Sequence, residues 1–141
     1  MMNSRERLNL ALNHKEPDRI PFDLGATVLT SIHRKSYRAL RKYLGMPAKE
    51  PEIADIFQQI VVVDEDIRKH LKVDVRNVAP RSSATFSIEI KEMQNYTYFY
   101  DEWGIGWKMP KDGGLYYDMF SHPLIGAQSI SEIENILGPI R

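Results

Sequence analysis

The chain has 141 residues with 19 basic and 19 acidic side chains, so its formal net charge at pH 7 is zero. That balance argues against a bulk positive field that would hold nucleic acid or an anionic membrane. The sequence has no cysteine, which excludes disulfides, thiol nucleophiles and thiolate metal ligands. The longest apolar run, residues 60–63, is far too short for a membrane span. We therefore expect a cytoplasmic protein with a single domain over residues 1–141.

The first expected element is a capped helix that leads into a buried strand. Asn3 is placed to cap the helix, and Glu6 three residues later would complete a capping box. Pro17 is expected to end the helix, and residues 20–24 to enter the interior as a strand. The helix carries an apolar stripe formed by Leu8, Ala11 and Leu12.

Two helical stretches and a strand are expected before residue 80. The first helix is capped at Thr30 or Ser31 and closed by Gly45. Residues 53–71 are predicted to be helical, in one run or two, with Asp64 capping the second part. Residues 73–78 alternate apolar and polar side chains, the period of a half-buried strand.

Beyond residue 80 the pattern changes to short strands separated by turns. The expected strands are residues 86–91, 96–100, 103–109 and 115–117. Ser131 and Glu134 predict a second capping box, at the start of a last helix. Helices come first and β-hairpins follow, so the predicted fold class is α+β.

Three segments, taken in order, carry a family resemblance. They are RERLNLALNHKEPDRIPFDLG (residues 5–25), DEDIRKHLKVDVRNVAP (64–80), and FYDEWGIGWK (99–108) followed by YYDMFSHPL (116–124). Together they resemble the N-terminal part of the uroporphyrinogen decarboxylase-like superfamily, which contains tetrapyrrole decarboxylases and cobamide-dependent methyltransferases. The resemblance implies a TIM (β/α)8 barrel, which needs about 250 residues. This chain would then supply only the N-terminal portion of such a domain, with the barrel incomplete.

The third segment resembles the methyltransferase-like branch of the superfamily. The tetrapyrrole decarboxylases hold substrate carboxylates with an arginine-bearing motif after the first strand, and the corresponding DLGATVLTSIHRK (residues 23–35) lacks it. The resemblance therefore implies part of a corrinoid-dependent methyltransferase-type protein that is not catalytic alone. A fragment of a uroporphyrinogen decarboxylase and a non-catalytic interaction module are the alternatives.

Cofactors and partners also follow from the resemblance. In complete methyltransferase relatives a zinc ion activates the substrate, and a corrinoid protein takes part in methyl transfer. The zinc ligands lie late in the barrel, so no metal site and no cofactor is expected in this chain. The implied partners are a corrinoid protein and, once the barrel is complete, a small-molecule substrate. Unpaired strand edges would alternatively favour self-association.

Five residues are candidate site residues. Asp23 is the catalytic candidate, because it ends the expected first barrel strand, where barrel enzymes place their active-site groups. The alternative is an aspartate that caps the following turn. Arg34, Trp103, Trp107 and His122 are the candidate substrate-binding residues. The two tryptophans would line an aromatic pocket, although clustered aromatic residues more often form the packed face of a hairpin.

Two further patterns have ordinary structural explanations. Asp101 and Glu102 are adjacent carboxylates, but neighbours in a strand point to opposite faces, which favours a polar turn over an acid/base pair. The basic stretch 33–42 has the charge to bind phosphate or carboxylate groups. Its bases are spread around the helix, which is typical of a solvated face.

Overall fold

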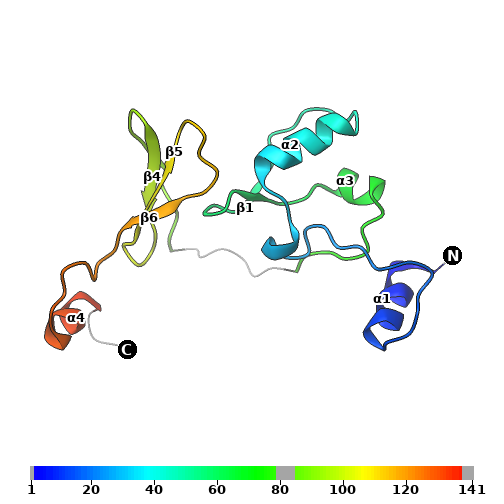
Figure 1. The fold of residues 1–141 in the computed structure, drawn as a ribbon, viewed down its shortest axis with the longest axis horizontal. Helices are drawn as coiled ribbons and strands as arrows, with labels where there is room; N and C mark the ends of the chain where they lie inside the picture. The colour runs from blue at the N-terminus through cyan, green and yellow to red at the C-terminus, as the bar shows by residue number, and fades with distance from the viewer. Residues whose placement is uncertain (1, 79–84, 138–141) are drawn as a thin grey trace. The chain divides into compact units, whose positions relative to one another are not determined.

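The computed structural model describes residues 2–78 and 85–137 (Figure 1). The chain divides into two compact units, Met1–Arg81 (unit 1) and Ser82–Arg141 (unit 2). The two units carry opposite charge: unit 1 has 15 basic and 11 acidic residues, and unit 2 has 4 basic and 8 acidic residues. The zero net charge of the whole chain therefore conceals a strong separation of charge along the sequence.

Helix α1 (Ser4–Leu12) begins with the expected capping box. Asn3 Oδ1 accepts a hydrogen bond from the Glu6 N–H, and Glu6 Oε2 accepts one from the Asn3 N–H, both at 2.9 Å. The helix ends at Leu12, well before Pro17. The expected apolar stripe does not anchor it, because the buried residue of α1 is Arg7 while Leu12 is exposed.

A buried ion cluster ties α1 to later parts of unit 1. Arg7 Nε lies 2.7 Å from Asp18 Oδ1, and Arg7 Nη1 lies 2.6 Å from Asp74 Oδ1. Arg19 Nη1 contacts the other Asp74 oxygen at 2.7 Å. We call this cluster the Asp74 network; it consists of Ser4, Arg7, Asp18, Arg19, Phe22 and Asp74.

The Asp74 carboxylate is charged although its side chain is 0% exposed. Burial disfavours the charged form and on its own raises the pKa. The Phe22 N–H donates to the carboxylate at 2.9 Å and the Ser4 hydroxyl at 2.8 Å. With the guanidinium groups of Arg19 and Arg7, these donors outweigh burial and hold the pKa of Asp74 well below its usual range.

The two strands expected at residues 20–24 and 73–78 are wrong, because neither segment forms a strand. Ile20 is 86% exposed instead of buried. A backbone hydrogen bond of 2.8 Å, donated by the Asp74 N–H, joins the two segments. Pro21 has no N–H to donate to a ladder. The Asp74 carboxylate and backbone thus connect the two segments that were each expected to be a strand.

Helix α2 (Arg34–Tyr43) supplies the central residue of the unit 1 core. It begins after a short 3-10 helix (Val28–Thr30) and is capped by His33, not by Thr30 or Ser31 as expected. Tyr37 on α2 is fully buried. The buried core consists of Tyr37, Val61, Val63 and Ile67.

The expected helical stretch 53–71 is a hairpin followed by a helix. The elements are β1 (Ile53–Asp55), antiparallel β2 (Ile60–Val61) and α3 (Glu65–His70). Asp55 Oδ1 accepts the Phe57 N–H at 2.8 Å and so builds the hairpin turn. The second part of the prediction is confirmed as a helix. Asp64 occupies its N-cap position, but its carboxylate makes no capping hydrogen bond.

Helices α1, α2 and α3 all end in the same way. A residue in the left-handed conformation follows each helix, and the next N–H returns to a carbonyl in the last turn. The left-handed residues are His14 (φ 55°), Gly45 (φ 66°) and Lys72 (φ 54°). The returning bonds run from Lys15 to Leu10, Met46 to Arg41 and Val73 to Arg68, each at 2.9 Å. Gly45 closes α2 as predicted.

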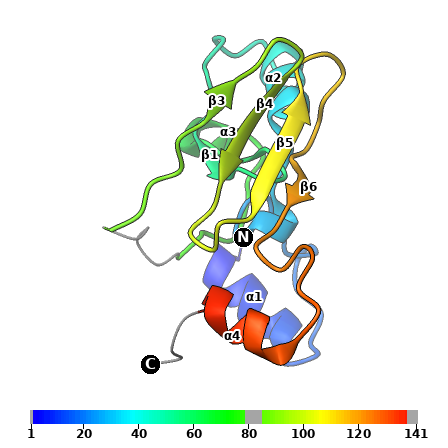
Figure 2. The ribbon, with the colours of Figure 1, turned by 90° about the vertical axis from the view of Figure 1, so that its left-hand side faces the viewer.

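Unit 2 is built on an antiparallel sheet in the order β3-β4-β5-β6, and Figure 2 shows β3, β4 and β5 side by side. The strands are β3 (Lys91–Glu92), β4 (Tyr96–Tyr100), β5 (Gly106–Pro110) and β6 (Asp118–Ser121). The prediction for residues 96–100 is confirmed. The strand expected at 86–91 is reduced to β3, and 115–117 is not a strand but leads into β6.

The two faces of this sheet carry different aromatic clusters. Phe99 and Tyr117 are buried, with ring centroids 4.8 Å apart. Tyr98 is 6.2 Å from the ring of Tyr100 and 6.4 Å from that of Phe120, both edge-on. Because side chains alternate along a strand, Phe99 and its two tyrosine neighbours lie on opposite faces.

Helix α4 (Ile130–Leu137) begins with a capping box, but not at the expected residues. Ser129 Oγ accepts the Glu132 N–H at 3.3 Å, and Glu132 Oε2 accepts the Ser129 N–H at 3.1 Å. The box therefore lies two residues before the predicted pair, Ser131 and Glu134. Both pairs have the same spacing, so the sequence pattern does not distinguish them.

The described residues form a small mixed α/β fold with four α-helices and antiparallel sheets. The predicted combination of helices and antiparallel hairpins is confirmed, but not their strict order, because the β1–β2 hairpin lies between α2 and α3 and helix α4 follows the four-stranded sheet. Over residues 2–78 and 85–137 the strands do not close into a barrel. In the same ranges, none of the helices has the length and apolar character needed to cross a membrane.

Candidate functional site

Asp23 and Arg34, two of the five predicted site residues, lie in unit 1 within local backbone structures. Asp23 Oδ1 accepts the Ala26 N–H at 3.0 Å, so the carboxylate caps the turn that follows it. Arg34 is the first residue of α2, and its N–H donates to the Gln59 carbonyl at 2.9 Å. The Asp23 carboxylate thus makes the turn-capping contact that was the alternative to a catalytic role.

Asp101 in unit 2 brings together Trp103 and Trp107. Its Oδ1 accepts the N–H groups of Trp103 and Ile105, each at 2.9 Å, and its Oδ2 accepts the Trp107 indole N–H at 2.9 Å. These bonds organise the turn between β4 and β5. Trp103 is 71% exposed beside this turn. Asp101 thus lies in a polar turn, the interpretation that the sequence favoured over an acid/base pair with Glu102.

His122, the last predicted site residue, follows β6 in unit 2 and is half-buried. Its carbonyl accepts the Ile125 N–H at 3.1 Å. The next residue, Pro123, lies against the β4–β5 turn, because a Cβ built on Gly104 would be 3.5 Å from its ring. The segment after His122 and the turn that carries Trp103 are therefore neighbours within unit 2.

Four aromatic side chains on the other face of the sheet, Tyr96, Tyr98, Tyr100 and Phe120, pack on one another around a lysine. Lys108 Nζ lies 5.5 Å from the ring centre of Phe120 and 6.0 Å from that of Tyr96. Tyr98 and Tyr100 also contact Phe120 edge-on or tilted. A cation from the chain itself thus takes the position that an aromatic pocket would offer to a cationic ligand. This arrangement agrees with a packed hairpin face.

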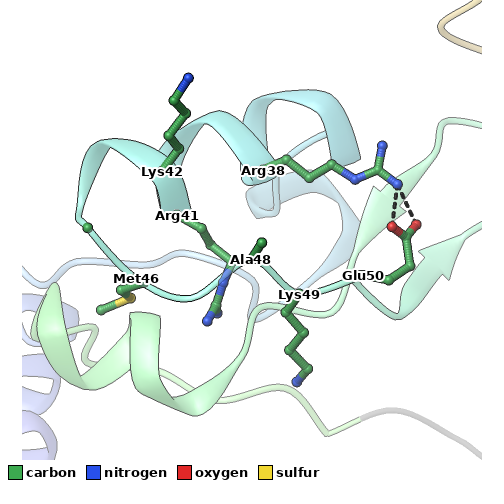
Figure 3. Close-up of a pocket in the computed structure, with 8 residues that line it drawn as sticks. Arg38, Arg41, Lys42, Met46, Ala48, Lys49 and Glu50 are labelled. Carbon is green, nitrogen blue, oxygen red and sulfur yellow. Dashed lines mark hydrogen bonds and ion pairs between the residues drawn. The ribbon is translucent and has the colours of Figure 1, made fainter.

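A cleft on unit 1 contains none of the five predicted site residues. It lies between the C-terminal half of α2 and the loop that follows (Figure 3), and its volume is about 620 Å³. Ligand pockets commonly have volumes of about 300–1,000 Å³. The lining residues are Arg38, Arg41, Lys42, Gly45, Met46, Ala48, Lys49 and Glu50. The left-handed Gly45 turns the chain back so that the loop faces the helix.

Arg41 is a buried wall of this cleft, and its charge is fully engaged. Its Nη2 lies 2.9 Å from Asp66 Oδ2, and its Nη1 lies 3.2 Å from Asp64 Oδ2. Nε donates to the Pro47 carbonyl at 3.0 Å, which fixes the loop to the helix. The hydrogen bond to Asp66 is the main reason that the pKa of Arg41 lies above its usual range. Arg41 therefore positions the loop and has little capacity left for a ligand.

Asp64 gathers several groups behind the cleft. The Tyr37 hydroxyl donates to Asp64 Oδ2 at 2.8 Å, and Lys49 Nζ contacts Oδ1. Burial raises the pKa of Tyr37. Burial would also raise the pKa of Asp64, but the hydrogen bonds from Lys49 and Tyr37 outweigh it and the net pKa is lowered. The Asp64 side chain thus joins the core of unit 1 to the cleft.

The rim of the cleft carries the more accessible charges. Arg38 Nη2 lies 2.5 Å from both oxygens of Glu50, and these two side chains are 46% and 71% exposed. The hydrogen bond from Arg38 is the main cause of the lowered pKa of Glu50. Lys42 projects from α2 at the other end of the cleft (Figure 3), and within the described part of the chain it has no ion-pair partner.

The basic stretch 33–42 is visible in the sequence but the cleft is not, because the cleft depends on the return loop at residues 45–50. Among the residues that the structure places, no group of three or more His, Asp or Glu side chains is arranged to hold a metal ion. Comparisons with protein families, with curated proteins and with solved structures found no match.

Proposed function

We propose that this chain is the N-terminal part of a uroporphyrinogen decarboxylase-like protein of the corrinoid methyltransferase type, and that it is a structural portion without catalysis of its own. In this proposal a complete barrel would bind the methyl donor and exchange its methyl group with a corrinoid protein. Zinc would be held by residues outside this chain. This chain would contribute structure only, with the Asp74 network holding the N-terminal segments of unit 1 together.

One observation supports the proposal above the others: the family-like segments supply the side chains that hold distant parts of unit 1 together. Arg7, Asp18 and Arg19 come from the first segment, and Asp74 comes from the second. Residues of two motifs that are far apart in sequence thus form one ion cluster. This is the behaviour expected of motifs that define an architecture. In the third segment, Asp101 organises the turn within its own motif.

The test uses the intact chain with zinc, a methyl donor and a corrinoid protein. We expect no methyl transfer above background, and saturable quenching of tryptophan emission by the corrinoid protein, because Trp103 is 71% exposed and a corrin absorbs indole emission. A Trp103→Phe variant should lose most of the quenching. Methyl transfer by the chain alone would overturn the structural role. Saturable quenching by uroporphyrin instead would favour the decarboxylase branch.

A second candidate function is a non-catalytic interaction module. It is favoured by β6, which pairs with β5 alone among the described strands and exposes Met119 and Phe120. Light scattering coupled to size-exclusion chromatography tests it. A concentration-dependent dimer that Met119→Lys dissolves supports this candidate, and a monomer at high concentration contradicts it.

A further inference from the structure

We propose that the cleft between α2 and residues 45–50 binds a small organic oxyanion with an apolar body, and that Glu50 occupies the anion position when no ligand is bound. The ligand class is an aryl or alkyl phosphate or carboxylate. The proposal concerns unit 1 alone and does not depend on the family resemblance.

The floor of the cleft suits an apolar body. Met46 and Ala48 contribute apolar surface, and the methylene stems of Arg38 and Lys42 extend it, since long basic side chains cover apolar surface with their stems. The floor is held in shape by the Met46 N–H, which returns to the Arg41 carbonyl at 2.9 Å. The hollow is therefore part of the helix ending and needs no ligand to form.

The charge around the cleft favours an anion. Its lining includes four basic side chains and one acidic side chain. Arg41 and Lys49 are engaged by the aspartates behind the cleft. Arg38 and Lys42 are left at the rim to meet a ligand. The ion pairs of buried Arg41 with Asp64 and Asp66 also hold this wall of the cleft in place.

The Arg38–Glu50 pair indicates where the oxyanion head would bind. Both Glu50 oxygens accept from Arg38 Nη2 at 2.5 Å, so Glu50 marks the position at which this guanidinium meets an oxyanion. Both partners are exposed, and exposed ion pairs contribute little to stability. A ligand phosphate or carboxylate can therefore replace Glu50 at low cost.

The binding test follows backbone amide signals of the intact chain by NMR. The probes are phenyl phosphate and benzoate, with inorganic phosphate as the anion that lacks an aryl ring and benzyl alcohol as the uncharged analogue of benzoate. We expect saturable shifts confined to residues 38–50 with phenyl phosphate or benzoate. Inorganic phosphate and benzyl alcohol should each bind at least about tenfold more weakly, because each lacks one of the two contacts.

Three variants make the test specific. Glu50→Gln should tighten phenyl phosphate binding about threefold, because it removes the competing carboxylate. Lys42→Ala should weaken binding about threefold or more by removing a rim charge. Lys69→Ala is the control: it is an exposed lysine of unit 1 on α3, removes the same charge and does not line the cleft. Its binding should equal that of the parent chain.

Several results would overturn the proposal. Benzyl alcohol binding as tightly as phenyl phosphate would remove the role of the anion, and equal binding of inorganic phosphate would remove the role of the apolar floor. An unchanged affinity in Glu50→Gln would contradict the competition at Arg38. Equal losses in Lys42→Ala and Lys69→Ala would indicate general charge attraction. All substituted side chains are exposed, and unchanged amide spectra outside residues 38–50 verify the fold of each variant.

Discussion

The two units of this chain reach a stable fold by different means. Unit 1 has a small apolar core around Tyr37 and joins its irregular segments with buried charges, above all at Asp74. Unit 2 has a regular sheet in which backbone pairing sets the register, and its buried contacts are aromatic. A segment without regular secondary structure is thus held by directional contacts between side chains, whereas paired strands rely on backbone pairing and alternating apolar side chains.

The sharpest way to break unit 2 is to remove its buried aromatic ring. Phe99→Ala should lower the free energy of unfolding of unit 2 by about 4 kcal/mol, through lost burial and a cavity beside Tyr117. Both tryptophans of the chain lie in unit 2, so urea unfolding followed by tryptophan emission reports this unit. Tyr100→Ala, on the exposed face of the same strand, is the control and should cost far less. Equal losses would contradict the packing described for Phe99.

The matching experiment in unit 1 removes a charge instead of a ring. Asp74→Asn should lower the free energy of unfolding of unit 1 by about 3 kcal/mol, because Arg7 keeps Asp18 but loses one of its two charged partners, and Arg19 loses its charged partner. Far-UV circular dichroism follows the loss of α1–α3. Glu65→Gln breaks the exposed pair with Arg76 and should have a much smaller effect. If the tryptophan transition moved as far as the helical one, the two units would not be independent.

Lowering the pH should destabilise unit 1 more than unit 2 without any mutation. The folded-state pKa of Asp74 lies below the unfolded value of about 3.9. A lowered pKa stabilises the fold above the unfolded value, and this contribution is lost as the pH falls through the folded pKa. Asp18 and Asp66, whose pKa values are lowered by Arg7 and Arg41, act in the same direction. Between pH 7 and pH 3 the urea midpoint of unit 1 should fall more than that of unit 2.

The smallest expected effect is a stabilisation at the end of α3. Lys72 is left-handed with φ 54°, a conformation that crowds its Cβ. Lys72→Gly should raise the stability of unit 1 by about 0.5 kcal/mol, since the relieved strain exceeds the entropy cost of glycine. Lys69→Gly, inside the same helix, should destabilise by about 1 kcal/mol. A loss of stability in Lys72→Gly would show that its side chain makes a contact that matters.

Local signals in the sequence predicted the elements that depend on neighbouring residues. The capping box of Asn3 and Glu6 and the aromatic strand 96–100 are of this kind. The hairpin at 53–61 was missed although its Asp55 turn is local, because the pairing of its strands also depends on packing of Val61 in the core. Its β-branched residues were the available signal. The sequences of segments 20–24 and 73–78 are typical of strands, but in the structure the Asp74 carboxylate joins these segments without a β-ladder.

The candidate site was less accessible from sequence than the fold. The sequence displays the basic residues of α2, but not which of them are neutralised. Arg41 is balanced by Asp64 and Asp66, which lie more than twenty residues away. Only the folded chain separates this buried cation from Arg38 at the rim. The polar turn at Asp101 was predictable because its partners lie within six residues.

The separation of charge between the two units has a consequence for handling this protein in solution. The chain as a whole has a sequence isoelectric point near 6.9, so copies at neutral pH do not repel one another through net charge. The positive unit of one copy and the negative unit of another attract at low ionic strength. Salt screens such attraction within about 10 Å at 0.1 M. We therefore expect solubility at neutral pH to rise on adding salt.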